Sequence, residues 1–214
     1  TALQTASYIA SRDTPKYANL SAMPYANPHA PKGGYISLSG KDTFDNLNAM
    51  NGKGSAVEGI DYIFDSLMKN SLDEPGVMYP LIAEKVTFDP VKTKFVIYHL
   101  NKKARFSDGS ALTAEDVKFT LDTYQTKSNP GLQMYIADLE KTEVLSKYQV
   151  KMTFKSDSNS EMPLILATLP IYSKKDWAKR DFTKVTMQPI LGSGPYTIER
   201  IDAGRSITYK RNPN

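Results

Sequence analysis

Residues 104–125 constrain the fold most, because this segment combines a tight turn with a complete helix start. Asp108-Gly109 is a turn dipeptide, since glycine adopts positive φ without steric cost. Thr113 stands at an N-cap position, and Glu115 and Asp116 follow in the first turn, where carboxylates face the positive end of the helix dipole. An apolar stripe at helical spacing comes next, made of Val117, Leu121 and Tyr124. We therefore expect a chain reversal and then a helix that packs on a core.

The rest of the chain predicts strands more often than helices. The expected strands are Tyr35–Ser39 after the Gly33-Gly34 turn, a hairpin of 79–86 with 94–100, a hairpin of 143–145 with 149–154, and a hairpin within 196–209. Residues 94–100 are apolar or aromatic on both faces, so this strand should be central in its sheet. Helices are expected over 59–72, over 160–168 with Ser160 as the N-cap, and over 174–180 after Ser173, with Trp177 packed beside this last helix. Near the N-terminus we expect at most a short helical piece at 2–11. Residues 129–131 should form a turn. Strands and helices do not alternate, which favours a mixed α+β architecture.

Composition excludes several classes of protein. The chain has 214 residues, 40% of them hydrophobic, which suits one large or two small globular domains. Without cysteine it can form no disulfide, thiolate metal site or Cys nucleophile. It shows neither a transmembrane run nor a signal peptide, so we expect a cytosolic protein or a mature or engineered form.

Charge and histidine content argue against nucleic-acid and metal binding. The net charge is +4, but lysines and arginines are dispersed without interleaved aromatics, which favours a solvated surface over a nucleic-acid patch. The two histidines, His29 and His99, cannot supply the three or four ligands of a zinc site. We expect no metal and no cofactor.

No catalytic group stands out either. Gly192-Ser193-Gly194 is one residue short of a nucleophile elbow and is followed by Pro195 and a strand rather than a helix. Asp65 lies within the expected helix 59–72, where a surface carboxylate needs no functional explanation. Binding is therefore a better hypothesis than catalysis.

Three motifs resemble those of one family, the family 5 extracellular solute-binding proteins, which include the oligopeptide-, dipeptide- and nickel-binding receptors of bacterial ABC importers. The motifs are Phe106-Ser107-Asp108-Gly109 with residues 111–117, Phe44-Asp45-Asn46-Leu47-Asn48, and Gly192-Ser193-Gly194-Pro195-Tyr196 with Lys210-Arg211-Asn212-Pro213. Pro31-Lys32-Gly33-Gly34, Asp73-Glu74-Pro75 and Asn212-Pro213 resemble the subgroup related to the receptor of the microcin C importer.

The resemblance implies an architecture. It is an α+β fold with mixed, largely antiparallel sheets and flanking helices, the N-terminal lobe part of a type II (cluster C) periplasmic binding protein. Residues 1–43 and 186–214 would belong to an incomplete large lobe, and residues 44–185 to a smaller inserted domain. Family members continue well beyond the position of Asn214, so we expect an N-terminal portion without the opposing lobe.

The resemblance also implies a function. The protein would be a monomeric, exported, periplasmic receptor that captures oligopeptides for an inner-membrane ABC permease, with no enzyme activity and no nucleic-acid partner. In the family the opposing lobe contacts the free amino group of the ligand. The residues expected to face the ligand here are Ser39, Gly40, Lys41, Asp42, Asn46, Ser193 and Tyr196.

Three alternatives remain open. The ligand could be another solute of the same family, such as a nickel chelate, a sugar or an opine. The chain could be a stand-alone basic domain that contacts an anionic partner. A hydrolase that depends on Ser193 ranks last.

Overall fold

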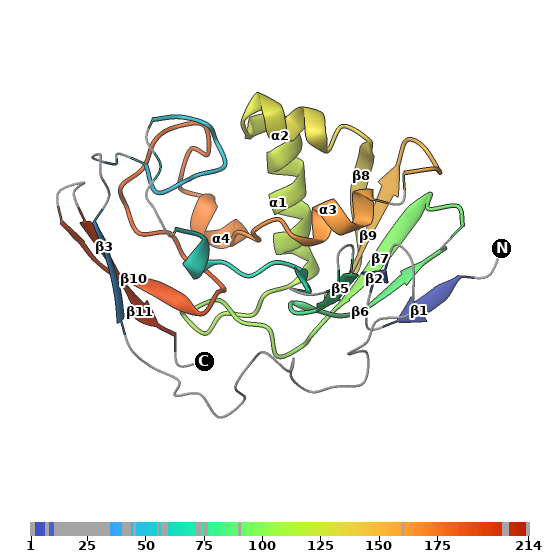
Figure 1. The fold of residues 1–214 in the computed structure, drawn as a ribbon, viewed down its shortest axis with the longest axis horizontal. Coiled ribbons are helices and arrows are strands. Elements are labelled where there is room, and N and C mark those ends of the chain that lie inside the picture. The colour runs from blue at the N-terminus through green and yellow to red at the C-terminus, as the bar shows by residue number, and fades with distance from the viewer. Residues whose placement is uncertain are drawn as a thin grey trace.

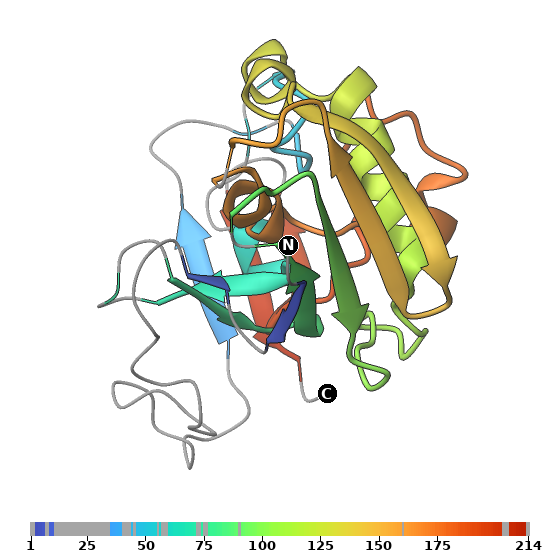
Figure 2. The same cartoon turned by 90° about the vertical axis from the view of Figure 1, so that its right-hand side faces the viewer.

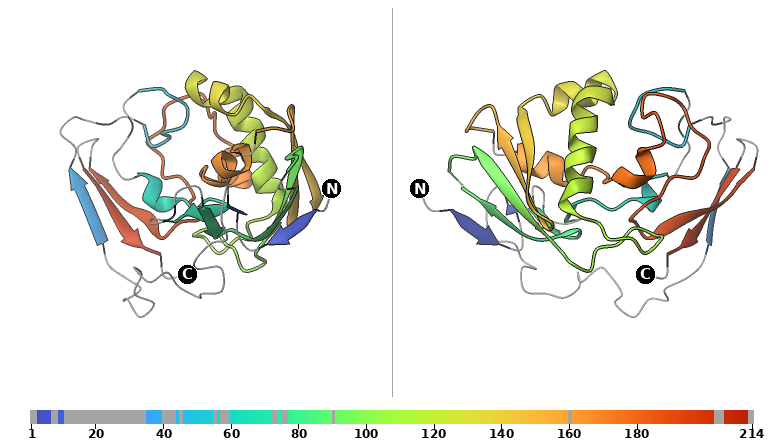
Figure 3. Two further views of the ribbon diagram at one scale, coloured as in Figure 1. Left: turned by 45° about the vertical axis from the view of Figure 1, so that its right-hand side comes forward. Right: turned by 180° about the vertical axis from the view of Figure 1, so that it is seen from behind.

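The computed structural model describes residues 3–6, 9–10, 35–39, 44, 46–54, 56, 60–71, 74, 77–89, 91–159, 161–202 and 206–212. In this part of the chain three antiparallel sheets are joined by helices and loops (Figure 1). A three-stranded sheet and a five-stranded sheet lie toward opposite ends of the molecule, with the long helix between them (Figure 3). The expected mixed α+β architecture is confirmed.

The largest sheet has five strands in the order β1-β6-β7-β9-β8. Their bounds are β1 (Gln4–Ala6), β6 (Ala83–Phe88), β7 (Phe95–Leu100), β9 (Gln149–Phe154) and β8 (Leu139–Ser146). The two expected pairings are confirmed, since β6 pairs with β7 and β8 with β9, all antiparallel. The expected bounds are wrong in part, because residues 79–80 belong to a separate strand of another sheet and β8 is longer than the expected 143–145. The prediction of a central strand also holds, because β7 lies between β6 and β9 and buries Val96, Tyr98 and Leu100.

The long helix α1 (Ala114–Lys127) begins where its cap signals predict. The Thr113 N–H donates to Asp116 Oδ2 at 2.9 Å, which satisfies one of the free donors at the helix start. The stripe of Val117, Leu121 and Tyr124 is fully buried, and α1 packs against β8 and β9 (Figure 2). Instead of a simple turn, Asn129 caps a second helix, α2 (Pro130–Tyr135), through its side-chain oxygen and Leu132 N–H.

A second sheet corrects two predictions. It has the order β2-β5-β4, with β2 (Ile9–Ala10), β5 (Val77–Pro80) and β4 (Met68–Asn70). The helix expected over 59–72 is wrong: this segment is a single 3-10 turn, η1 (Ile60–Ile63), an irregular stretch and then β4. The expected helical piece near 2–11 is also wrong for the described residues, which form β1 and β2. In both places pairing with a neighbouring strand outweighs the preference of the local sequence for a helix.

The third sheet joins the two ends of the chain. Its order is β10-β11-β3, with β10 (Tyr196–Asp202), β11 (Ser206–Arg211) and β3 (Tyr35–Ser39). The predicted hairpin of β10 with β11 is confirmed. β3 pairs with β11 along its whole length, from Ser39 opposite Ser206 to Tyr35 opposite Lys210.

These pairings bear on the expected division into domains. β3 and the β10–β11 hairpin share a sheet, so strands from both ends of the described chain lie side by side. β1 and β2, however, pair with β6 and β5 of the inserted segment. Residues 4–6 and 9–10 therefore lie with the range 44–185, and the boundaries themselves stay a prediction.

Two short helices complete the described chain. They are α3 (Met162–Ala167) and α4 (Lys174–Trp177). Ser173 caps α4 as predicted, because its Oγ accepts from the Asp176 N–H at 3.2 Å. Trp177 is buried and lies edge-on to Tyr172, with ring centroids 5.5 Å apart. The cap expected at Ser160 lies outside the described residues.

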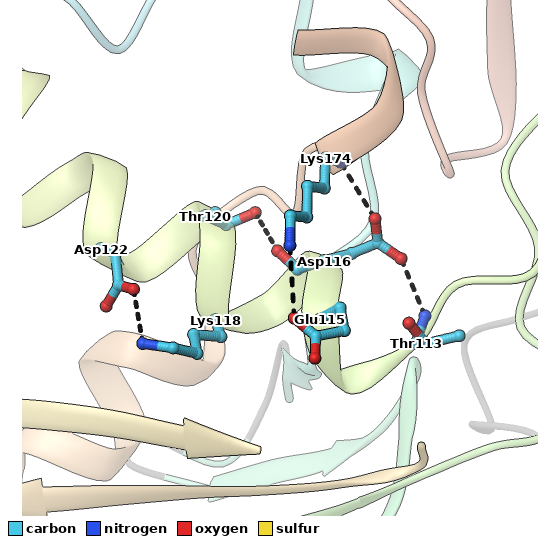
Figure 4. A network of polar contacts seen from close by, with 7 residues as sticks. All are labelled: Thr113, Glu115, Asp116, Lys118, Thr120, Asp122 and Lys174. Atoms are coloured by element: carbon cyan, nitrogen blue, oxygen red, sulfur yellow. Dashed lines mark hydrogen bonds and ion pairs between the residues drawn. The ribbon is translucent and has the colours of Figure 1, made fainter. Parts of the chain in front are cut away.

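Asp116 ties α4 to the start of α1. Its Oδ1 accepts from the Lys174 N–H at 3.0 Å while Oδ2 accepts from Thr113 (Figure 4). Burial raises the pKa of this carboxyl, and the hydrogen bonds from these N–H groups oppose the rise. One side chain thus holds two helix starts together.

Candidate functional site

The segment 191–195 crosses directly over the backbone of η1. Gly194 N–H donates to the Ile63 carbonyl at 2.7 Å, and the Gly192 carbonyl accepts from Ser107 N–H at 2.8 Å. A Cβ at Gly192 would lie 1.9 Å from the Ile63 oxygen, and one at Gly194 would lie 2.5 Å from the Phe64 nitrogen. The two glycines are therefore required by this close approach.

Ser193 lies between these glycines and contacts the next residue of the same crossing. Its Oγ accepts from the Asp65 N–H at 3.1 Å. β10 begins only three residues later, at Tyr196. The geometry is that of a backbone contact leading into a strand, and it agrees with the sequence argument that Gly192-Ser193-Gly194 is no nucleophile elbow.

Asp65 is the unexpected member of this region. The sequence prediction placed it on a helix surface, but it follows η1 in irregular, partly buried chain. Burial raises the pKa of its carboxyl from 3.8 to about 6, and the cations Lys69 and Arg211 only partly oppose this. Within the described ranges the carboxylate makes no hydrogen bond or ion pair. The sequence argument considered Asp65 but treated it as a residue on the surface of a helix, so its partial burial was not predicted.

Tyr196 and Arg211 lie on the strands that follow the crossing. They face each other in the β10–β11 register, and the Arg211 guanidinium lies 5.5 Å from the centre of the Tyr196 ring. Asn212, next to Arg211, returns to the crossing through its side-chain nitrogen, which donates to the Gly194 carbonyl at 3.3 Å. Asp65, Ser193, Tyr196 and Arg211 therefore gather around one crossing, and we call them the Asp65 cluster.

Asn46, another residue expected to face the ligand, has a different environment. It is fully buried, and its side-chain nitrogen donates to the carbonyls of Asn48 and Lys53 and to Asn51 Oδ1. Its oxygen accepts from the Thr186 N–H at 3.1 Å. These bonds hold the loop 46–54 against the segment 182–186, so the geometry gives Asn46 a structural role, and contact with a ligand stays a prediction.

The remaining expected residues are only partly placed. Ser39 ends β3, opposite Ser206. Gly40, Lys41 and Asp42 lie outside the described residues. The structure thus brings together Ser193 and Tyr196, and it adds Asp65 and Arg211 to them.

A surface depression of about 280 Å³ follows the outer side of α1 and does not include the expected residues. Two exposed ion pairs cross its lining, Lys118 with Asp122 at 2.7 Å and Lys174 with Glu115 at 3.5 Å (Figure 4). Exposed pairs of this kind contribute little to stability. We regard the depression as ordinary surface.

Two further features were searched for in the described residues. They contain no group of three or more His, Asp or Glu side chains placed to hold a metal ion. In the same ranges, none of the helices has both the length and the apolar character needed to cross a membrane.

The fold is shared with solved structures of solute receptors. One is NikZ from Campylobacter jejuni in complex with Ni(L-His), with a TM-score of 0.66 and 19% identity over 80% of this chain and 34% of that one. A second is the oligopeptide-binding protein AppA from Bacillus subtilis in complex with a nonapeptide, with a TM-score of 0.62 and 19% identity over 83% of this chain and 39% of that one. A third is the periplasmic oligopeptide-binding protein of an ABC transporter from Thermotoga maritima, with a TM-score of 0.64 and 25% identity over 80% of this chain and 32% of that one. The class is therefore the type II periplasmic binding protein fold.

Sequence comparison identifies the family within this class. The model of the bacterial extracellular solute-binding proteins, family 5 Middle, matches residues 77–214. The chain belongs to family 5 of the bacterial extracellular solute-binding proteins.

Two relatives from Agrobacterium fabrum illustrate the similarity. The "Probable peptide-binding protein YejA" is 36% identical over 87% of this chain and 31% of its own length. The "Peptidoglycan-binding protein YepA" is 34% identical over 96% of this chain and 35% of its own length. The chain spans about a third of the length of the curated relatives it matches.

Proposed function

We propose that this chain is part of a periplasmic receptor that captures oligopeptides and delivers them, chemically unchanged, to an inner-membrane ABC permease. Family membership together with the peptide-binding name of a relative carries this proposal. The Thermotoga maritima protein, an oligopeptide-binding protein by name, supports it at 25% identity. Main-chain hydrogen bonding to strands is sequence-tolerant, which suits a receptor for varied peptides.

The proposal assigns different parts of the chain to the two domains. β3 and the β10–β11 hairpin belong to the large lobe, within the ranges 1–43 and 186–214, and the range 44–185 forms the smaller domain, joined by β1 and β2. The ligand lies near the crossing of 191–195, where Ser193 and Tyr196 face it together with the expected segment 39–42. The receptor acts as a monomer and has no catalytic residue.

Binding to the protein expressed from its complete reading frame tests the proposal. Pools of peptides with three to nine residues are titrated by calorimetry, with mannohexaose, nickel–histidine and agropinic acid as competing ligand classes. Saturable peptide binding with no cleavage of the peptide, checked by mass spectrometry, is the expected result. Binding of one of the other three ligands without peptide binding would overturn it.

A specific observation favours one alternative. The Thermotoga maritima protein was also solved with bound mannohexaose, at 25% identity over 74% of this chain and a TM-score of 0.59. A carbohydrate is therefore the second candidate ligand. A stand-alone basic domain is distinguished by salt, because contacts with an anionic polymer weaken steeply as the salt concentration rises.

A further inference from the structure

We infer that the Asp65 carboxylate is a ligand contact that takes a positively charged nitrogen group, an ammonium or a guanidinium. The inference rests on the proposed function, since it names a chemical preference of the same binding region. It goes beyond the expected residues, which did not include Asp65.

The main chain holds Asp65 in a fixed position from two sides. Its N–H donates to Ser193 Oγ at 3.1 Å, and its carbonyl accepts from the Ile171 N–H at 3.2 Å. The preceding residue, Phe64, is buried against Tyr172 with ring centroids 4.7 Å apart. A carboxylate carried by such a segment is preorganised, so little conformational entropy is lost when a ligand binds to it.

The carboxylate is unusual because, among the described residues, no cation forms an ion pair with it. In the described part of the chain it has no partner within the 4.0 Å of an ion pair, although Lys69 and Arg211 are near enough to act on its charge. Desolvation outweighs both cations and raises the pKa. A partly buried charge without a partner lowers stability, and such costs are retained mainly at functional sites.

The chemistry of the cluster favours a cation over other ligands. An ionised carboxylate is only an acceptor, and charged N–H donors make its strongest hydrogen bonds. Arg211 lies over the Tyr196 ring, so it does not occupy the carboxylate itself. An anionic group would be repelled by Asp65, and a neutral donor would leave the carboxylate without an ion-pair partner. A cation restores both the hydrogen bonds and the charge balance.

Three probes test the inference with the protein expressed from its complete reading frame: trilysine, trinorleucine and N-acetyl-trinorleucine. Asp65→Asn removes the charge and keeps the shape. We expect this variant to bind trilysine at least roughly tenfold more weakly, because a charge-assisted hydrogen bond is lost, and to bind N-acetyl-trinorleucine unchanged. Trinorleucine separates the two sources of the cation. If the variant also binds trinorleucine more weakly, Asp65 takes the terminal ammonium; if its affinity for trinorleucine is unchanged, Asp65 takes a cationic side chain. An equal loss of affinity for all three probes, or no loss of affinity for any of them, would overturn the inference.

Asp61→Asn, at an exposed position on η1, is the matched control and should change none of the affinities.

A second measurement separates this inference from the proposed function. The titration midpoint of the Asp65 carboxyl carbon is followed by NMR with and without millimolar 1,5-diaminopentane. Because a bound cation favours the ionised form, the midpoint should fall from about 6 when the diamine is added. An unmoved midpoint would overturn the role of Asp65 even if peptides bind. Failure of every peptide to bind would instead overturn peptide capture, and a shifted midpoint would still support the cation contact.

Discussion

Replacing Asp65 by asparagine should stabilise the folded protein at neutral pH. The folded pKa of about 6 exceeds the ordinary value of 3.8, so the folded state binds this proton more tightly than the unfolded chain does. The stability contributed by protonated Asp65 is therefore complete below pH 3.8 and is lost as the pH rises through 6. Above that pH the fold carries the full cost of the buried charge.

The size of the effect follows from the same two values. The rise from 3.8 to about 6 corresponds to about 3 kcal/mol at pH 7.5 and about 0.5 kcal/mol at pH 4. Asp65 is only partly buried, and water relaxes around its charge, so we expect a measured gain of about 1–3 kcal/mol in the free energy of unfolding of Asp65→Asn at pH 7.5. For a chain of this length a gain of about 2 kcal/mol raises the Tm by about 4–8 °C.

Urea denaturation followed by circular dichroism measures this gain at pH 4 and pH 7.5. Subtracting the wild-type value at each pH cancels the titration of all other carboxyls. Asp61→Asn, at the exposed position, should give no comparable gain. A gain that is equal at both values of pH, or a loss at pH 7.5, would refute the argument from desolvation.

Three further substitutions test the packing around the site and the core. Gly194→Ala should cost about 3 kcal/mol or more in unfolding free energy, because its Cβ would meet backbone at 2.5 Å, and a normal urea midpoint would contradict the close approach. Asp116→Ala should cost about 2–4 kcal/mol and speed hydrogen exchange at the Thr113 and Lys174 amides, which lose their acceptor; unchanged exchange there would contradict the link between α1 and α4. Tyr98→Phe should cost about 1–2 kcal/mol by calorimetry, because its buried hydroxyl donates to a main-chain carbonyl at 2.8 Å, and a neutral result would show that this carbonyl finds another donor.

The elements with strong local signals could be predicted from the sequence. α1 has a cap residue, acidic residues in its first turn and a regular apolar stripe, all within one segment. β9 buries alternate residues, as its alternating sequence predicted. β7 is central as predicted, although only alternate residues are fully buried and its sequence is apolar on both faces. Gly192-Ser193-Gly194 was correctly predicted to lead into a strand rather than a helix. The reason for glycine at 192 and 194, the close approach to the backbone of Ile63 and Phe64, needed the structure.

The segment 59–72 shows why other elements could not. Its apolar residues Ile60, Phe64, Leu67 and Met68 are all buried, as the helical pattern suggested. Burial alone does not fix a period over so short a run, and β4 instead pairs with β5. This one error also hid Asp65, because a helix would have placed its carboxylate in solvent.

The amino-acid sequence by itself determined most of the local elements and the mixed α+β class, because capping residues, turn dipeptides and alternating apolar residues act over a few neighbouring positions. The family followed from the resemblance of its motifs. Only the tertiary structure decided that β3 completes the sheet of β10 and β11, that β1 and β2 join the strands of the inserted segment, and that Asp65 lies partly buried beside Ser193 and near Arg211. Pairing between distant strands and the desolvation of a charge depend on which parts of the chain meet in space, and short-range patterns carry no information about that meeting.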